Sequence, residues 1–437
     1  MALFSWKLMS VSYFASCFLF LPHSIQSFTM RSTFILPLFI FLAALHATAQ
    51  PTRFISVKKT EIIGVDGKPF HMVGTNLGNW LVPEGYMFKF KHSSSPRLIQ
   101  EVLNELVGPD AANVFWKKYL DNYITREDIR YLKSIGMNSI RIPFHYKLFT
   151  NEDYLGGRGE KRGFALMDRV VQWCKQENLY VLLDMHCAPG GQTGDNIDDS
   201  WGYPYLFENA ESQQLTIDIW RKIARHYKNE TIILGYDLLN EPIAHFFDAT
   251  VLNPLLEPLY KRIVKAVREE DKNHLIFLGG AQWNSNFKVF GSPFDSKLVY
   301  TFHKYWTPAT IDVIQDYIDF GNKYQVPIYC GETGENTDEW VMQFRKLMDE
   351  QRIGWHFWPY KKMDNTRGIV SFPIPEGFQT VMAFADTTRT TFEQVRKVSP
   401  SDRKATLKAL DGFLENCLFK NCTGNKGYIE ALGFKEK

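Results

Sequence analysis

Residues 233–242 read ILGYDLLNEP, a short apolar run that stops at an amide, a carboxylate and a proline. Near-continuous apolar character is typical of a strand buried on both faces, as in a parallel sheet. Asn240 and Glu241 then stand at the carboxyl end of that strand. Because a buried charge is unfavourable unless it is paired or used, this placement indicates a functional site.

Seven further stretches have the same character, and helical periodicity follows many of them. The eight predicted strands cover residues 70–76, 137–144, 179–186, 233–240, 274–280, 298–305, 326–332 and 353–360. Predicted helices cover residues 164–178, 211–228, 257–270, 338–350 and 402–416. Eight strand–helix units predict an α/β protein, a single-domain (β/α)8 TIM barrel.

An open doubly wound sheet is the alternative fold, but no glycine-rich phosphate loop follows the first predicted strand. Residues 362–400 are predicted to form a long, mostly irregular stretch that borders the barrel mouth.

The N-terminus has the layout of a secretory signal. Residues 30–50 read MRSTFILPLFIFLAALHATAQ, with one Arg, an apolar run and small residues before a cleavage point after Ala49. We expect residues 1–49 to be a signal peptide with Met30 as the true start, and residues 50–437 to be the barrel domain. The apolar run is too short for a span of about 20 residues. A secreted or periplasmic protein is expected, with an uncleaved anchor as the alternative.

The composition indicates which classes of binding partner suit this protein. The net charge of +2 and the absence of a basic block argue against nucleic acid. Aromatic residues make up 15% of the chain, which suits a large core or a groove for sugars. Cys417 and Cys422 could close a small disulfide loop, whereas Cys174, Cys187 and Cys330 are expected to be free and buried. No Cys/His spacing is typical of a zinc site.

Polar and aromatic residues gather at the predicted carboxyl ends of the strands, where a TIM barrel places its active site. Six of the eight strands contribute to this set, which comprises Arg141, Asp184, His186, Asn240, Glu241, His303, Tyr305, Glu332 and Trp358. Each alone has a structural explanation, such as an ion pair, a satisfied histidine or a helix cap. Their joint placement favours an active site. Glu241 and Glu332 come from strands on opposite sides of the barrel, and a facing carboxylate pair is the requirement of glycoside hydrolysis.

Five motifs in this order carry a family resemblance. They are RIP on the second strand, NEP after the fourth, HKY on the sixth, CGETGEN at the seventh and a Trp on the eighth. Together they resemble glycoside hydrolase family 5, in the retaining clan A, over residues 70–360. LDMHCAPGGQTGDN and GTNLGNWLVPE resemble the branch that contains fungal exo-1,3-glucanases and their bacterial relatives.

The resemblance implies roles for these residues. Glu241 would be the general acid/base and Glu332 the nucleophile. Asn240 would bind the sugar 2-hydroxyl, and Arg141 would keep the nucleophile ionised. The remaining support residues would hold the nucleophile, line the subsite and form its floor; they are Tyr305, His186, His303 and Trp358. His303 would also help to set the protonation of Glu241.

Two ambiguities concern single residues. Glu335 also lies in CGETGEN, but Glu332 ends the strand and is the favoured nucleophile. Asp184 is interpreted as support for His186. Four tryptophans in rim loops are candidates for stacking on sugars in outer subsites: Trp80, Trp201, Trp283 and Trp306.

The implied protein is a secreted, monomeric, retaining β-glycosidase that hydrolyses a β-glucan polysaccharide or oligosaccharide without cofactor or metal. Endo-β-1,4-glucanase, mannanase and β-1,6-glucanase activities remain open. A non-catalytic carbohydrate-binding barrel is a further alternative, which the presence of both carboxylates disfavours. A metal-dependent hydrolase would use His186, His303 and Glu332.

Overall fold

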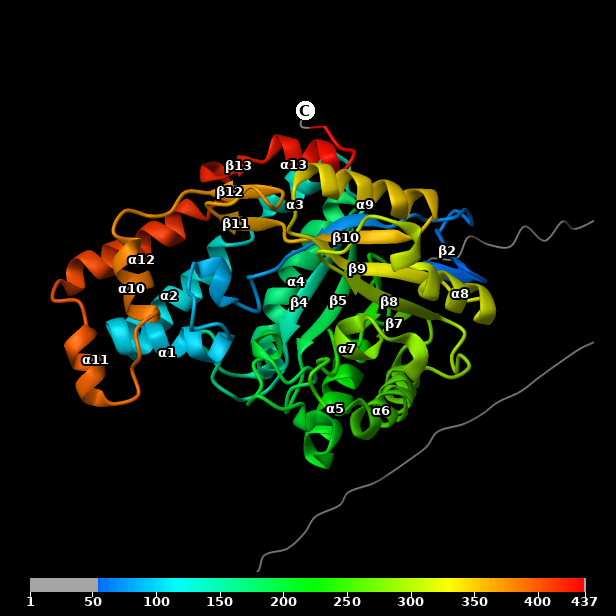
Figure 1. The fold of residues 1–437 in the computed structure, drawn as a ribbon, viewed down its shortest axis with the longest axis horizontal. Coiled ribbons are helices and arrows are strands. Elements are labelled where there is room, and N and C mark those ends of the chain that lie inside the picture. Colours follow the sequence, from blue (N-terminus) through cyan, green and yellow to red (C-terminus); the bar gives the residue numbers. More distant parts are fainter. Residues whose placement is uncertain (1–53, 436–437) are drawn as a thin grey trace, which may run out of the picture. The chain divides into compact units, whose positions relative to one another are not determined.

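The computed structural model describes residues 54–435, so the predicted signal peptide lies outside the described residues. Eight parallel strands form a closed barrel (Figure 1). They are β3 (Val73–Asn76), β4 (Ser139–His145), β5 (Tyr180–Cys187), β6 (Ile233–Asp237), β7 (Leu275–Gly279), β8 (Leu298–Lys304), β9 (Ile328–Gly334) and β10 (Gly354–Trp358). Each strand pairs with the next along the chain, and β10 closes the ring on β3. The predicted TIM barrel is confirmed and the open sheet is excluded.

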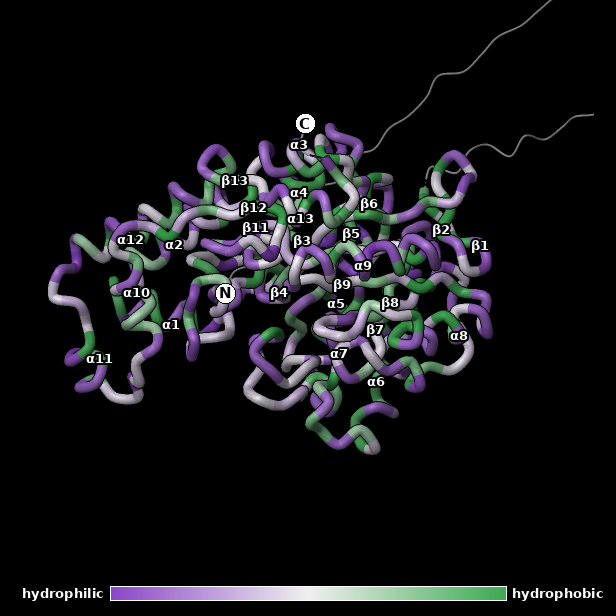
Figure 2. Tube along the Cα trace, turned by 45° about the horizontal axis from the view of Figure 1, so that its top comes forward, coloured by the Kyte–Doolittle hydropathy of each residue, from purple (hydrophilic) through white to green (hydrophobic). Residues whose placement is uncertain are grey.

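Helices surround the barrel and bury one face each against it. They are α3 (Arg126–Ile135), α4 (Glu160–Glu177), α5 (Ala210–Tyr227), α6 (Ala249–Glu270), α8 (Gln315–Tyr324) and α9 (Asp338–Glu350). In α4, which confirms the helix predicted at 164–178, Leu166, Val170 and Cys174 are buried and Trp173 is partly buried. Hydrophobic and hydrophilic residues alternate along these helices in Figure 2, as expected for elements with one face in the core.

The prediction for residues 362–400 was wrong. This part of the chain contains most of β11 (Lys361–Met363) and all of β12 (Val370–Phe372), α10 (Phe378–Ala385) and α11 (Phe392–Val398). β12 pairs with β11 on one side and on the other with β13 (Thr423–Gly424), about fifty residues later. Strands of two or three residues are too short to show a periodicity in the sequence. They form because they pair with a distant segment.

Further elements flank the barrel. A hairpin of β1 (Ser56–Lys58) and β2 (Glu61–Ile63) precedes β3, and α1 (Pro96–Val107) and α2 (Pro109–Asn122) lie in the long connection from β3 to β4. The predicted last helix is confirmed as α12 (Arg403–Asn416), which packs on α2 and α10 and is followed by α13 (Lys426–Ala431).

All five cysteines in residues 54–435 are free thiols. The Cys417–Cys422 bridge that the spacing allows is therefore not formed, and each of these sulfurs instead lies near a backbone carbonyl at the end of α12. Within the same residues, no helix combines the length and the apolar character needed to cross a membrane.

Candidate active site

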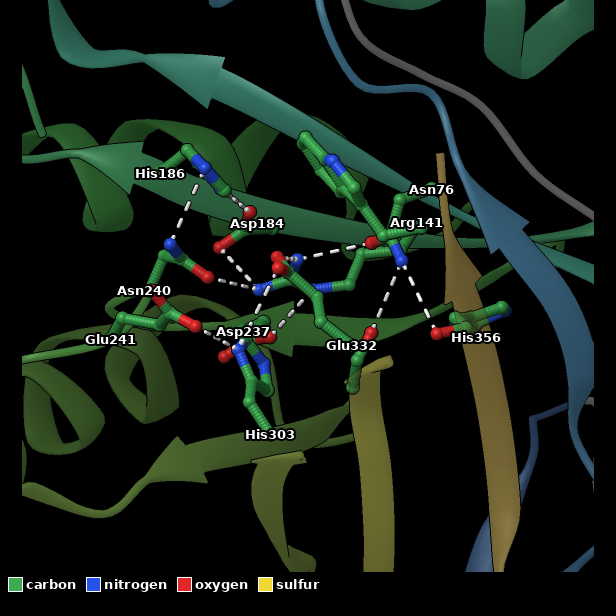
Figure 3. A network of polar contacts seen from close by, with 12 residues as sticks. Asn76, Arg141, Asp184, His186, Asp237, Asn240, Glu241, His303, Glu332 and His356 are labelled. Atoms are coloured by element: carbon green, nitrogen blue, oxygen red, sulfur yellow. Dashed lines mark hydrogen bonds and ion pairs between the residues drawn. The ribbon is translucent and has the colours of Figure 1, made fainter. Parts of the chain in front are cut away.

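The carboxyl ends of the barrel strands open into one cavity of about 660 Å³. Six predicted site residues line it: His186, Glu241, His303, Tyr305, Glu332 and Trp358. The other two, Arg141 and Asn240, are fully buried beneath its wall and contact each other (Figure 3). The structure therefore brings these eight residues together, and the ninth residue of the strand-end set, Asp184, contacts both Arg141 and His186.

Arg141 on β4 is the centre of a buried polar network. Its guanidinium lies 2.9 Å from Asp237, 3.1 Å from Asp184 and 2.5 Å from Glu332. It also donates to the side-chain oxygens of Asn76 and Asn240. Burial raises the pKa of both Asp184 and Asp237 to about 7, while Arg141 opposes that shift. One fixed cation thus makes a cluster of buried carboxylates tolerable.

Glu332 on β9 has an environment that stabilises negative charge. Its Oε1 accepts from Arg141, and its Oε2 accepts from the Tyr305 hydroxyl at 3.1 Å. The Nδ1 atom of His303 lies 3.7 Å from the same Oε2. Both oxygens of the Glu332 carboxylate therefore accept hydrogen bonds, one from a cation and one from a hydroxyl.

Glu241 has the opposite environment. Burial raises the pKa of Glu241 to about 7, and His186 and Arg141 oppose the shift. Its Oε1 lies 2.7 Å from His303 Nδ1. A carboxylate oxygen of Glu241 and one of Glu332 lie within 4.8 Å of each other.

Glu241 is positioned by loops rather than by a strand, because β6 already ends at Asp237. Its backbone has a left-handed φ of 46°, which is uncommon for a residue with a side chain. The loop after β5 holds this conformation. The Thr193 hydroxyl donates to the Glu241 carbonyl at 2.8 Å, and the Gln192 amide donates to the Asn240 carbonyl at 2.8 Å. Gln192 and Thr193, from the LDMHCAPGGQTGDN stretch, therefore hold the NEP segment in place.

His186 is fixed from three sides. Its Nδ1 lies 2.8 Å from Asp184, its Nε2 faces the Asn240 amide nitrogen at 3.3 Å, and its ring lies parallel to the Trp358 indole. An amide nitrogen can only donate, so the His186 proton is on Nδ1, toward Asp184. Burial lowers the pKa of His186 to about 4, which keeps the ring neutral. The expected support of His186 by Asp184 is present.

The strand-end pattern missed several residues of the cavity region, and four of them, Glu84, Tyr86, Glu335 and Lys362, interact with one another. Glu84 follows β3 in the GTNLGNWLVPE stretch; its carboxyl is buried, and its Oε1 has no hydrogen-bond partner among the described residues. Burial, then the charges of Glu335 and Glu332, raise the pKa of Glu84 well above its ordinary value. Tyr86 accepts from the Trp358 indole at 2.8 Å. The GTNLGNWLVPE stretch carries part of the family resemblance. Its loop residues have no periodicity, however, that would show which side chains line the cavity.

Glu335, the second glutamate of CGETGEN, is the third of these residues and forms an ion pair with Lys362, the fourth. The Lys362 ammonium in turn lies 4.9 Å from the Tyr86 ring centroid. Glu335 therefore forms an ion pair at the cavity edge, directly after the end of β9.

The four rim tryptophans divide clearly. Trp80 is fully buried and donates to the Leu120 carbonyl, so it cannot stack on a sugar. Trp201 is exposed but packs against Arg97 and does not line the cavity. Trp283 and Trp306 both line it, and Trp306 is 72% exposed.

Several side chains of the site carry atoms that could bind a metal ion. Among the described residues, two sets have candidate ligand atoms within 4.8 Å of one another: Asp184, His186 and Glu332, and Glu241, His303 and Glu332. Glu332 belongs to both sets and already contacts Arg141. A divalent cation there would meet a fixed, buried positive charge, so the donor set suits proton transfer better than metal coordination.

Known proteins share the sequence features of this barrel. A family model described as cellulase (glycosyl hydrolase family 5) matches residues 105–364. A β-xylosidase of Phanerodontia chrysosporium is 33% identical over 270 residues, covering 61% of this chain and 52% of that protein. The chain thus spans about half the length of this relative.

Two other relatives match over most of their length. Endoglucanase C of Acetivibrio thermocellus is 29% identical over 313 residues, covering 57% of this chain and 88% of that protein. A probable glucan 1,3-β-glucosidase A of Aspergillus fumigatus is 25% identical over 315 residues, covering 68% of this chain and 73% of that protein.

Proposed function

Because the chain belongs to glycosyl hydrolase family 5, we propose that it hydrolyses the glycosidic bonds of a β-glucan with retention of configuration. Glu241 is the acid/base and Glu332 the nucleophile. The observation that carries this proposal is the pair itself. The two carboxylates have oxygens within 4.8 Å of each other; Glu332 accepts from Arg141 and Tyr305, whereas burial raises the pKa of Glu241. Retaining enzymes place their carboxyl groups about 5–5.5 Å apart, whereas inverting enzymes need about 6.5–9.5 Å for a water.

The first chemical step uses both residues. The ionised Glu332 attacks the anomeric carbon and forms a glycosyl ester, while the bond from that carbon to the leaving oxygen breaks. The proton of Glu241 goes to the leaving oxygen, so the product is a neutral alcohol. Tyr305 and Arg141 hold Glu332 in place, and each donates a hydrogen bond to it.

The second step reverses the roles. The Glu241 carboxylate takes a proton from water, the resulting hydroxide oxygen bonds to the anomeric carbon, and Glu332 leaves as a carboxylate. The anomeric carbon is inverted twice, so the product keeps the substrate configuration. The pKa of Glu241, raised by burial to about 7, suits a group that must give and then take a proton near neutral pH.

The position of the acid, Glu241, distinguishes the side of the cavity that holds the reacting sugar from the side that holds the leaving group. Trp358 forms the floor under the reacting sugar, and Asn240 binds its 2-hydroxyl through the amide hydrogen that His186 does not use. Trp283 and Trp306 line the same cavity as Glu241, and we propose that they contact the leaving group. Their rings suit the apolar face of a sugar unit in the leaving group.

The substrate class rests on the relatives, whose names include endoglucanase and glucan 1,3-β-glucosidase. We favour a β-1,3- or β-1,4-linked glucan and an exported protein, as the predicted signal peptide suggests. A panel of β-1,3-, β-1,4- and β-1,6-glucans, mannan and xylan, with product sizes, assigns the linkage and separates exo from endo action. The absence of products from every member of the panel would favour a carbohydrate-binding barrel.

The catalytic proposal is tested by three substitutions. Glu332→Gln should abolish turnover of a dinitrophenyl β-glucoside while the fold, followed by circular dichroism, is unchanged. Glu335→Gln, three residues along the same segment, should retain turnover. Glu241→Ala should impair poor leaving groups far more than good ones, and added azide should yield a β-glycosyl azide; an α-azide would contradict retention.

A further inference from the structure

We propose that Asn284 is a positioning residue that fixes the tautomer of His303 and thereby directs the acid proton of Glu241 toward the leaving group. This inference rests on the proposed acid/base role of Glu241. Asn284 is fully buried on the turn after β7, and it is outside the set of residues that the strand-end pattern predicted.

The argument starts from a chain of three side chains. The Asn284 amide nitrogen lies 3.1 Å from His303 Nε2, and His303 Nδ1 lies 2.7 Å from Glu241 Oε1. An amide nitrogen can only donate, so His303 Nε2 must be the acceptor. A neutral imidazole that accepts at Nε2 carries its proton on Nδ1. His303 therefore donates to Glu241 Oε1.

This donation decides where the acid proton stands. Because Oε1 accepts from His303, the proton of Glu241 must occupy the other oxygen, Oε2. That proton is then free to move to the leaving oxygen of the substrate. When Glu241 has given it up, the Nδ1–H group of His303 stabilises the new carboxylate charge.

The backbone that carries Asn284 is strained. α7 (Ala281–Asn284) contains three consecutive residues with left-handed φ values, at 51°, 55° and 57° for Gln282, Trp283 and Asn284. Left-handed backbone is unfavourable for residues other than glycine, and three such residues in a row are seldom retained without a functional reason. The Gln282 side chain holds the turn through bonds with Asn253 and Asn286.

Two glycines make room for the Asn284–His303 contact. A Cβ on Gly279, at the end of β7, would stand 2.1 Å from Asn284 Oδ1, and a Cβ on Gly331 of β9 would stand 2.8 Å from His303 Nε2. Both side chains thus pack directly on backbone that has no side chain. The Asn284 Oδ1 atom is buried and has no hydrogen-bond partner among the described residues, so only the amide nitrogen is engaged.

The charged surroundings of His303 agree with a neutral ring. Glu332 of β9, Arg141 of β4, His186 of β5 and Glu241 of the β6 loop face it. Burial lowers the pKa of His303 to about 3, with Glu332 opposing and Arg141 reinforcing the shift. The His303 ring therefore stays neutral at the pH values at which the enzyme would act. A hydrogen-bonding neighbour can then determine which of its two nitrogens carries the proton.

Loss of the Asn284 donor would release the other tautomer. With the proton on Nε2, the Nδ1 lone pair of His303 would face Glu241 and accept its O–H. The acid proton would then be turned away from the substrate and held more tightly. The pKa of Glu241 would rise, and transfer of its proton to a poor leaving group would become slower.

The test uses Asn284→Asp, which keeps the shape but offers only acceptors. We expect kcat/KM for a phenyl β-glycoside to fall by about 10- to 100-fold, within the range of general acid catalysis, and kcat/KM for the dinitrophenyl glycoside to change little. The basic limb of the pH profile for the phenyl substrate should move to higher pH. Asn322→Asp, at an exposed position of α8, is the matched control, since it makes the same substitution away from the cavity and from His303; it should leave the ratio of kcat/KM for the two substrates unchanged.

An equal loss on both substrates, or an unmoved basic limb, would overturn the inference. If Asn284→Asp does not fold, nitrogen NMR of histidine-labelled unaltered protein decides the question: Nδ1 of His303 is expected to be protonated and Nε2 bare, and the reverse contradicts the assignment. Glu241→Ala is measured in parallel. If it also fails to discriminate between leaving groups, the acid/base role is wrong; if it discriminates and Asn284→Asp does not, only the role of Asn284 is wrong.

Discussion

At the scale of single residues, the site depends on one cation. Arg141 is fully buried and contacts Asp184, Asp237 and Glu332, so three carboxylates share one guanidinium. Breaking a buried ion pair leaves the remaining charges uncompensated, which is more damaging than never having built the pair.

Arg141→Met should therefore destabilise the fold by about 3–5 kcal/mol, measured by urea denaturation. The pKa of Asp184 and of Asp237 is already raised by burial in the folded protein, and loss of the opposing cation should raise both further above the unfolded value. Ionisation in the unfolded chain then favours unfolding, so the loss should be larger at about pH 8 than at about pH 5, where the groups can be protonated. A loss that is the same at both pH values would argue against this network.

The pH dependence of turnover should report Glu241. Its carboxyl must be protonated for the first step, and burial raises its pKa to about 7, so kcat/KM for a poor leaving group should fall above about pH 7. With Glu241→Ala and a dinitrophenyl substrate, which needs no proton, this limb should disappear. Persistence of the limb in that variant would assign it to another group.

The site residues were predictable where strands end, and less so elsewhere. Glu332 and Trp358 lie in strands whose buried character fixes where their carboxyl ends point. Glu84 and Asn284 lie in loops, and their positions depend on packing between segments far apart in the chain. No local pattern encodes that packing.

At the scale of elements, eight strands were predictable in number and order, with boundaries displaced by up to three residues, as at β6. Parallel strands buried on both faces are apolar throughout, and this signal survives in the sequence. The β11–β12–β13 sheet was not predictable, because its strands are stabilised by pairing rather than by their own composition.

The C-terminal helix α12 is expected to be essential to stability. Phe413 lies parallel to Phe88 with ring centroids 5.0 Å apart, and it also contacts Phe372 and Phe378. Phe413→Ala should lower the free energy of unfolding by about 3–5 kcal/mol. Phe392→Ala on α11, where the ring is 85% exposed, is the control and should change it by less than about 0.5 kcal/mol. Similar losses in both variants would contradict this assignment of α12 to the core.

At the scale of the whole molecule, the closed barrel brings segments that are far apart in the described chain to one cavity. The residues that line it run from Glu84 to Trp358 in the sequence. In this arrangement strands carry most of the buried polar network, whereas loops carry the exposed rim and also Glu241. We therefore expect substitutions at the rim to change the preference for substrates while the chemical step is kept.

Trp306 tests that expectation, because it is 72% exposed and adjacent to Tyr305. Trp306→Ala should raise KM for a polymeric or oligomeric glucan by about 10-fold, equivalent to the loss of one stacking interaction. Activity on a small aryl glycoside should be nearly unchanged. Trp201→Ala, also exposed but outside the cavity, should alter neither; an equal effect of both substitutions would remove Trp306 from substrate binding.

The central claim is that Glu332 forms a covalent bond with the sugar. Incubation with a dinitrophenyl 2-deoxy-2-fluoroglycoside should trap this intermediate, and mass spectrometry of the digested protein should find one fluorosugar on the peptide that contains CGETGEN, attached at Glu332. Attachment at Glu335 or Glu241, or turnover with no covalent adduct and an inverted product, would contradict the account.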